Sequence, residues 1–150
     1  MTTKRSSDIG QSVEAEVIAA VERMTEAFHR ADLEGVMAAY ANGAVVAFEP
    51  GRPVSDAAAM RAGFRMFFGF KPHFTYGGHE VLASGDLAVH LAPWTMDGTG
   101  PDGEPLRQNG LSVALLRRQP DGQWKLVIDN PFGDRLLHTA EKKPRTEESA

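Results

Sequence analysis

The sequence predicts an α+β fold, a single domain whose helices pack on one face of an antiparallel sheet. Apolar residues recur at helical spacing from residue 12 to about residue 71, with one short strand pattern between them. Beyond Pro72 the helical period is lost, and strand patterns continue almost to Asp134. A run of helices followed by a run of strands is typical of the α+β class, and 150 residues are enough for one core.

The composition narrows the classes of function. A net charge of −4 and a pI near 5.7 give no electrostatic case for nucleic acid or an anionic membrane as a partner. The absence of cysteine excludes disulfides, thiolate nucleophiles and cysteine metal sites, and it fits a reducing compartment. No stretch approaches the roughly 18 apolar residues of a membrane span, and no signal-peptide pattern is present. We expect a soluble, cytoplasmic protein.

The chain divides into three segments. Residues 1–11 are polar and unpatterned, and residues 138–150 contain no large apolar side chain. Both segments are predicted to be disordered, because neither can bury enough apolar surface to offset the entropy of ordering. Residues 12–137 form the predicted domain.

The helices come first in the domain. From Ser12 the first helix carries apolar residues at helical spacing, namely Val13, Val17, Ala20, Val21, Met24, Phe28 and Ala31. Asp32 is the predicted N-cap of a short second helix, which Asn42-Gly43 ends. Residues 44–49 then read as a strand that Pro50-Gly51 breaks.

A third helix, capped by Ser55 or Asp56, precedes the sheet. Its apolar stripe consists of Met60, Phe64, Phe67 and Phe68. Strand patterns follow over residues 73–84 and 87–96, separated by the turn residues Ser84-Gly85-Asp86. Residues 97–105 form a loop rich in glycine and proline. Although Gly98, Gly100 and Gly103 match a GxGxxG pattern, no helix opens after them, so a hairpin loop explains them better than a dinucleotide site.

The last hairpin spans residues 111–132 and turns at Pro120-Asp121-Gly122. On its second strand one face carries Trp124, Leu126, Ile128 and Asn130, because side chains alternate. This face is predicted to be a packed wall that ends at a polar amide. Asp129 has the opposite parity, so it and Asn130 both face inward only if a bulge intervenes.

Both faces of the strand at residues 87–96 are largely apolar. A strand with one face in water would alternate more cleanly between apolar and polar residues. If the helices cover only one face of the sheet, a second copy of the chain is the simplest cover for the other, since two-fold homodimers are the commonest assembly. We therefore expect a homodimer.

Several segments resemble the NTF2-like superfamily, which includes ketosteroid isomerase-like, SnoaL-like and DUF4440-like proteins. They are Ala31-Asp32-Leu33, the aromatic Tyr40, the strand closing on Pro50-Gly51, Ser84-Gly85-Asp86-Leu87-Ala88 and Asp121-Gly122-Gln123-Trp124-Lys125. The resemblance covers about residues 12–137. It implies a strongly curved sheet wrapped by three helices into a cone, a ligand pocket at the open end, and dimerisation. It specifies the fold more than the activity, because one fold hosts many functions.

The resemblance also suggests a catalytic carboxylate. Ketosteroid isomerases place an aspartate before a proline at the end of this first strand, where this chain has Glu49 before Pro50, although an ungapped match puts Phe48 at that position. A carboxylate in an apolar cone would have a raised pKa and would move protons. The alternative is a solvated glutamate at a strand end. Met24 stands where the family has its oxyanion tyrosine, and residues 111–116 contain no Asp or Glu, so steroid isomerisation is not expected.

His90 is the second catalytic candidate. It shares a strand face with Trp94, and its pKa lies near neutrality, so it is suited to act as acid or base. SnoaL-like cyclases and scytalone dehydratase-like members pair a histidine with a carboxylate, and this resemblance makes Glu49 and His90 the candidate pair. The alternative is a half-buried histidine at the dimer surface.

A ligand pocket is predicted from apolar side chains with a few amides. Its candidate lining residues are Met24, Tyr40, Phe64, Phe68, Trp94, Asn109 and Asn130. No histidine and carboxylate set has metal-ligand spacing, so neither metal nor cofactor is expected. The expected ligand is a small apolar organic molecule. The protein is then either an acid–base isomerase, cyclase or dehydratase, or a non-catalytic binding or dimerisation module, and Glu49 and His90 facing one cavity would favour the enzyme.

Overall fold

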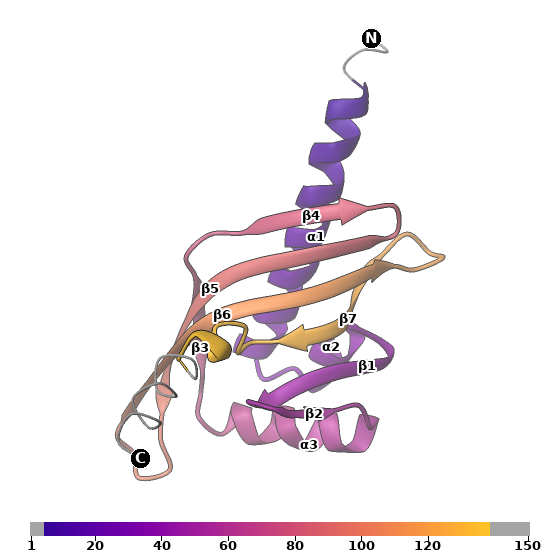
Figure 1. The fold of residues 1–150 in the computed structure, drawn as a ribbon. Coiled ribbons are helices and arrows are strands. Elements are labelled where there is room, and N and C mark those ends of the chain that lie inside the picture. The colour runs from indigo at the N-terminus through magenta and orange to yellow at the C-terminus, as the bar shows by residue number, and fades with distance from the viewer. Residues whose placement is uncertain (1–4, 139–150) are drawn as a thin grey trace, which may run out of the picture.

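The structure of the protein, a computed structural model, describes residues 5–138 and has the predicted α+β architecture (Figure 1). The order of elements is α1 (Arg5–His29), α2 (Leu33–Ala38), β1 (Tyr40–Glu49), β2 (Arg52–Val54), α3 (Ala57–Phe68), β3 (His73–Tyr76), β4 (Glu80–Ser84), β5 (Leu87–Thr99), β6 (Pro105–Arg118) and β7 (Trp124–Asn130). One helical turn at residues 135–138 ends the described chain. In Figure 1 helices α1 and α2 lie behind the sheet.

The seven strands form one open sheet in the order β2-β1-β7-β6-β5-β3, and β4 pairs with β5 as well. All neighbouring strands are antiparallel except β1 and β7, which are parallel. The parallel pair was not predicted. It forms because β1 joins the sheet beside the last strand, and a parallel pair needs a long connection of the kind that α3 and the strands after it provide.

The long strands β5 and β6 carry the curvature of the sheet. They pair from Leu87 to Thr99, whereas β3 and β4 pair with opposite ends of β5. The predicted single strand at residues 73–84 is therefore two strands. The chain breaks at Gly77-Gly78, where Gly78 has a φ of +139° that other residues rarely adopt.

The first part of the domain differs from the prediction at two boundaries. Helix α1 begins at Arg5, upstream of the predicted start at Ser12, which fits the low cost of extending a formed helix by single residues. Residues 1–4 of the predicted arm, and the predicted tail from residue 139 onward, lie outside the described residues. Helix α2 ends at Ala38, and β1 already begins at Tyr40. Gly43 does not end a helix. It has a φ of +76° inside β1, where the pairing with β7 is irregular.

The caps and turns are mostly where the sequence places them. Asp32 caps α2 by accepting a hydrogen bond from the Gly35 amide at 3.0 Å, and Asp56 caps α3 by accepting from the Ala59 amide at 2.9 Å. Gly51 turns the chain into β2, a short strand that the sequence did not predict. These caps fix where the helices begin, and α3 begins after the β1–β2 hairpin and packs over the sheet.

A bulge in β7 decides which side chains face the helices. Leu116 pairs with Leu126 and Leu115 pairs with Ile128, so Val127 is an extra residue. The alternation shifts there, which leaves Ile128 44% exposed and Asp129 9% exposed. The predicted wall therefore ends after Leu126, and Asp129 rather than Asn130 faces inward.

The core lies between the helices and the concave face of the sheet. Phe28 of α1 is its aromatic centre, with ring centroids 5.0 Å from Phe68, 5.6 Å from Phe74 and 5.7 Å from Phe64. These rings meet edge to face, which is a favourable arrangement for aromatic pairs. The core therefore joins α1, α3 and β3.

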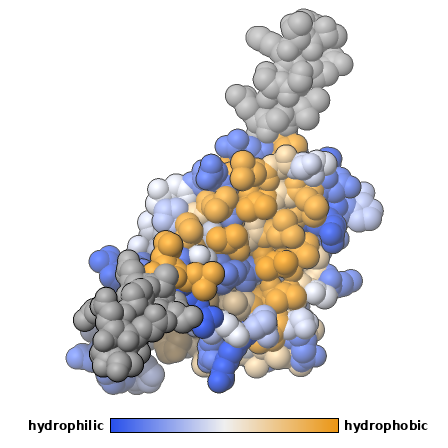
Figure 2. All heavy atoms as spheres, in the orientation of Figure 1, coloured by the Kyte–Doolittle hydropathy of each residue, from blue (hydrophilic) through white to orange (hydrophobic). Residues whose placement is uncertain are grey.

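The convex face of the sheet carries a second set of apolar side chains. On neighbouring strands Val89 pairs with Leu115 and Leu91 with Val113, while Leu82 is 61% exposed. Figure 2 shows the apolar side chains gathered over this face. We call it the open sheet face. No helix within residues 5–138 is both long and apolar enough to cross a membrane.

Candidate functional site

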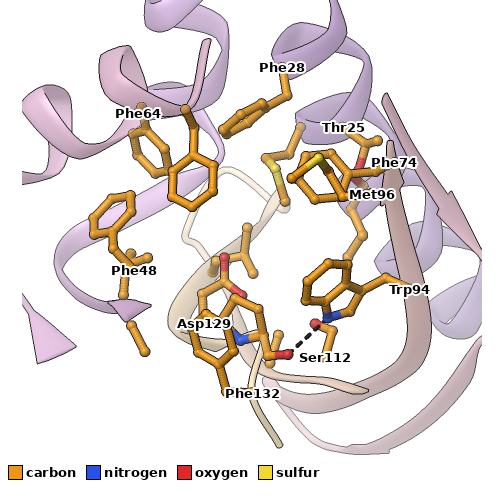
Figure 3. Close-up of a pocket in the computed structure, with 18 of the residues that line it drawn as sticks. Thr25, Phe28, Phe48, Phe64, Phe74, Trp94, Met96, Ser112, Asp129 and Phe132 are labelled. Carbon is orange, nitrogen blue, oxygen red and sulfur yellow. Dashed lines mark hydrogen bonds between the residues drawn. The ribbon is translucent and has the colours of Figure 1, made fainter. Parts of the chain in front are cut away.

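A cavity of about 100 Å³ lies between the helices and the concave face of the sheet. Its lining is mostly apolar and aromatic, as the close-up in Figure 3 shows. The aromatic lining residues are Phe28, Tyr40, Phe48, Phe64, Phe67, Phe74, Tyr76, Trp94 and Phe132. The cavity volume is below the about 150 Å³ of engineered apolar cavities that hold benzene, so the space suits a molecule of at most about one ring.

Two glycines let aromatic rings approach this cavity. A Cβ atom on Gly63 of α3 would lie 2.7 Å from the ring of Phe48, and one on Gly110 of β6 would lie 3.0 Å from the ring of Trp94. Real Cβ atoms essentially never show the first distance, and the second is tighter than nine in ten of their contacts. The Trp94 indole donates a hydrogen bond to the Pro131 carbonyl at 2.8 Å, which fixes the ring at the cavity wall.

Asp129 is the buried carboxyl group of the cavity. The β7 bulge turns it inward, and in Figure 3 it lies between the Phe48 and Phe64 side and the Trp94 side. The Tyr40 hydroxyl donates a hydrogen bond of 2.5 Å to Asp129 Oδ2. Burial raises the pKa of Asp129, and the Tyr40 hydrogen bond opposes part of that rise. The result is a carboxyl group suited to exchange a proton nearer to neutral pH.

The two tyrosines of the cavity stay protonated. Burial, together with the nearby Asp129 charge, raises the pKa of Tyr40 well above its ordinary value. Burial raises the pKa of Tyr76 to about 12. The Tyr76 hydroxyl lies 2.9 Å from Thr25 Oγ1, whose own proton goes to the Val21 carbonyl at 3.0 Å. Both phenols are therefore hydrogen-bond donors rather than bases.

His90 also lines the cavity and is almost fully buried, with 1% of its surface exposed. Its Nε2 lies 2.8 Å from Nδ1 of His79, while its own Nδ1 is buried without a hydrogen-bond partner. Burial, with a smaller effect of His79, lowers the pKa of His90 to about 4. His90 is therefore neutral at pH 7.

The structure brings part of the predicted site together. Five predicted residues line the cavity, namely Met24, Tyr40, Phe64, Trp94 and His90. Phe68 does not line it but packs on Phe28 behind the wall. Asn109 is exposed on β6 opposite Thr95, and the Asn130 side chain accepts a hydrogen bond from the Phe132 amide at 3.0 Å. Neither amide faces the cavity, Asn130 because of the bulge.

Glu49 lies outside the cavity. Its side chain is 66% exposed at the end of β1, and it forms a 3.8 Å ion pair with Arg52. Phe48 occupies the inward position instead, as the ungapped match of the sequence indicates. The structure thus does not bring Glu49 and His90 to one cavity. Neighbouring side chains of a strand point to opposite faces, so with Phe48 facing the cavity Glu49 faces away from it.

No direct signal in the sequence marks Thr25 and Tyr76 of the cavity, or His79, which contacts His90 from outside it. For Asp129 the sequence indicated only that it and Asn130 could both face inward if a bulge intervened. The bulge is present, but it turns Asp129 inward and leaves Asn130 outside the cavity. Among residues 5–138, no group of three or more His, Cys, Asp or Glu side chains is placed to hold a metal ion.

Comparison with solved structures supports the fold. The chain is similar to a candidate dehydratase of the NTF2-like family from Streptomyces avermitilis, with 18% identity, a TM-score of 0.70, and coverage of 80% of this chain and 95% of the other. A candidate ketosteroid isomerase from Shewanella frigidimarina gives 16% identity and a TM-score of 0.63, covering 75% and 90%. The association domain of CaMKII from C. elegans gives 15% identity and a TM-score of 0.66, covering 82% and 97%.

At these identities the structures show a shared fold and not a shared activity. No curated protein matches the sequence. The model of the SnoaL-like domain matches residues 21–127, which include α2, α3 and all of β1 to β6. On the strength of that match, this chain belongs to the SnoaL-like family, within the NTF2-like fold.

Proposed function

We propose that the protein is an acid–base enzyme of the isomerase, cyclase or dehydratase kind, acting on a small and largely apolar organic molecule. The observation that carries this proposal is a buried carboxyl group, Asp129, facing the same aromatic cavity as a buried imidazole, His90. Perturbed titratable groups in an apolar cavity are the usual mark of proton-transfer chemistry.

Asp129 is the proposed proton-transfer group. Tyr40 occupies its Oδ2, and among the described residues no hydrogen bond is made to Oδ1. Oδ1 is thus available to a ligand atom. Because the pKa of Asp129 is raised, its charged form is a stronger base than an exposed aspartate, and its neutral form persists to a higher pH. The hydrogen bond from Tyr40 would keep the Asp129 carboxyl group oriented while it gains and loses its proton.

His90 is the proposed polar partner of the substrate. Its Nδ1 is a buried nitrogen without a hydrogen bond, and leaving such a group unsatisfied typically costs about 1–3 kcal/mol. A ligand hydroxyl or carbonyl that bonds to it would remove that cost. The aromatic walls would hold the apolar body of the ligand, so a ring bearing one oxygen group is the ligand chemistry that fits best.

Binding is tested by a thermal-shift screen of monocyclic phenols, enones and cyclic ketones. A ligand that binds the folded state raises the apparent stability by about 2.7 kcal/mol at a hundred times its Kd. Ser112 also lines the cavity, so Ser112→Phe is the matched control with the cavity filled. Compounds that stabilise the wild type but not this variant support the cavity site. Equal shifts in both proteins refute it.

Proton transfer is tested with 3-cyclohexen-1-one, a single ring with one carbonyl oxygen. Its isomerisation to the conjugated 2-cyclohexen-1-one needs one proton removed and one returned, and ultraviolet absorbance follows it. We expect Asp129→Asn to lower the rate by about 100-fold or more, as is usual for a lost general base. Binding without turnover of the probe or of any screened ligand would favour the non-catalytic binding module.

We also propose that the protein is a homodimer through the open sheet face. The apolar side chains of that face lack a cover in the single chain, and the NTF2-like fold also forms an association domain in CaMKII. We expect Leu82→Lys with Ile128→Lys to yield monomers in sedimentation velocity. Met66→Lys, on the equally exposed surface of α3, is the control and leaves the dimer intact. A monomeric wild type would refute the proposal.

A further inference from the structure

Two histidines form a continuous contact between the cavity and the outer surface. His90 lines the cavity, whereas His79 does not. The half-buried ring of His79 lines a separate groove along α1 and β3. The His79 Nδ1 to His90 Nε2 distance of 2.8 Å joins the two spaces.

The chain break between β3 and β4 places His79 there. Val81 of β4 pairs with His90, and side chains two residues apart lie on the same side of a strand. The Gly77-Gly78 break, anchored by the hydrogen bond from the Gly77 amide to the Pro93 carbonyl at 2.8 Å, brings the chain back over β5 just before His79. Tyr76 packs against both imidazoles, with ring centroids 5.3 Å from His79 and 6.4 Å from His90.

A hydrogen bond between two neutral imidazoles holds a single proton. If His90 Nε2 carries it, His90 Nδ1 is an acceptor toward the cavity. If His79 Nδ1 carries it, His90 carries its own proton on Nδ1 and is a donor toward the cavity. The two arrangements differ only in the position of protons along one line. Each presents the opposite hydrogen-bonding character to a ligand.

We infer that His90 and His79 form a proton relay that connects the buried cavity with the groove along α1. This inference rests on the proposed acid–base function. In the outward direction the ligand gives a proton to His90 Nδ1, His90 Nε2 passes its proton to His79 Nδ1, and His79 Nε2 releases its proton to water. In the inward direction each step reverses. No oxidation or reduction occurs, and each imidazole stays neutral before and after transfer.

The relay has a consequence for the class of reaction. One outward transfer leaves both imidazoles in the opposite tautomer, and one inward transfer restores them. A reaction that removes a proton and later returns one therefore resets the relay without any ring rotation. Isomerisation of an enol or enone has this balance. Because burial lowers the pKa of His90, a second proton on its buried ring is disfavoured. His90 therefore passes a proton on and does not hold an extra one.

The charges around the two ends differ. On the cavity side His90 shares its space with Asp129, Tyr40 and Tyr76. On the groove side His79 shares its space with Glu22, Glu26, Arg23, His29, Arg30 and His73. The carboxylates of Glu22 and Glu26 on α1 lie near the surface as acceptors for the proton that His79 releases.

The first test observes the tautomers by nitrogen NMR of the histidine rings at pH 7.5. A relay predicts signals of His90 Nδ1 and Nε2 that are averaged between the protonated and unprotonated positions. In His79→Gln, whose amide still bonds to His90 but conducts no proton, we expect one fixed tautomer. A single fixed tautomer of His90 in the wild type would overturn the relay. This outcome is measured on the wild type alone, so it depends neither on a substrate nor on whether the variant folds.

The second test uses isomerisation of 3-cyclohexen-1-one by the full chain, because this reaction removes one proton and returns one. We expect His79→Gln to lower kcat by about tenfold or more with KM unchanged, and added imidazole to restore kcat in His79→Ala. His73→Gln is the matched control, because His73 lines the same groove but stacks on His29. Wild-type kcat in His79→Gln overturns the relay alone. Failure of Asp129→Asn to slow the same reaction counts against the proposed function instead.

Discussion

Tyr40→Phe isolates the hydrogen bond that the Tyr40 hydroxyl donates to the Asp129 carboxyl group. Tyr40 is 6% exposed, so phenylalanine keeps the ring packing and removes only the hydroxyl that lies 2.5 Å from Asp129 Oδ2. A hydrogen bond to a charged group contributes about 1.5–3 kcal/mol, and a neutral one about 1 kcal/mol. We expect a loss near 2–3 kcal/mol in the free energy of unfolding at pH values above the folded pKa of Asp129, where its carboxyl group is charged.

The loss should shrink in acid. The pKa of Asp129 is higher in the folded state than in the unfolded state. Between these two pKa values the folded state therefore binds more protons than the unfolded state. The stability that Asp129 contributes thus falls as the pH rises from the unfolded pKa to the folded pKa. Removing the Tyr40 hydroxyl raises the folded pKa further and extends this window upward. Below the folded pKa of Asp129 we expect a loss nearer about 1 kcal/mol, the value of a neutral hydrogen bond.

Urea unfolding over a series of pH values measures this difference. Tyr76→Phe is the control, because the Tyr76 hydroxyl bonds to the neutral Thr25 at 2.9 Å and its loss should be independent of pH. At about 2–4 °C per kcal/mol for a chain of this size, Tyr40→Phe should also lower Tm by several degrees at the alkaline end of the series. A loss that stays equal over the whole series would refute the assignment of Asp129 as a buried carboxyl group held by Tyr40.

Three further predictions concern other positions. Gly63→Val should push Phe48 into the cavity and abolish the ligand-induced thermal shift while the fold is kept, because a Cβ there would lie 2.7 Å from that ring; retained ligand shifts would argue against the cavity site. His90→Leu should make the protein more resistant to acid. The pKa of His90 is about 4 in the folded protein and ordinarily 6.5, so the wild type loses stability as the pH falls from about 6.5 toward 4. Unfolding midpoints from pH 7 to pH 4 would check this. Asp32→Ala and Asp56→Ala should each cost about 1 kcal/mol in urea unfolding through loss of a helix N-cap, and losses near zero would contradict the cap assignments.

The sequence predicted the fold class and most elements because they depend on local signals. Asp32 and Asp56 act as N-caps through their own neighbouring amides, and the turn at Gly122 depends on a local φ of +88°. The helical stripe of α3 and the alternation of β5 likewise appear within short windows of sequence. The parallel pairing of β1 with β7 has no such signal, since its partners are far apart in the chain.

The site was predicted only in part, for the same reason. Aromatic lining residues such as Phe64 and Trp94 follow from periodicity, because periodicity states which side chains share a face. Which carboxyl group enters the cavity depends instead on single-residue register. The pairing irregularity near Glu49 and the extra residue Val127 each determine which side chains of their strand face the cavity. The amino-acid composition of these segments predicts neither irregularity. His79 depends on a break at two glycines, whose direction the sequence does not encode locally.

The contact between Tyr40 and Asp129 joins residues 89 positions apart and belongs to the parallel pair of β1 with β7. During synthesis the early part of the chain therefore waits, with an unpaired strand edge, until the last strand has left the ribosome. Such long loops close slowly, and exposed edges of this kind attract other chains. A truncation before Trp124, which removes β7, would leave β1 without this partner and with a strand edge prone to aggregate.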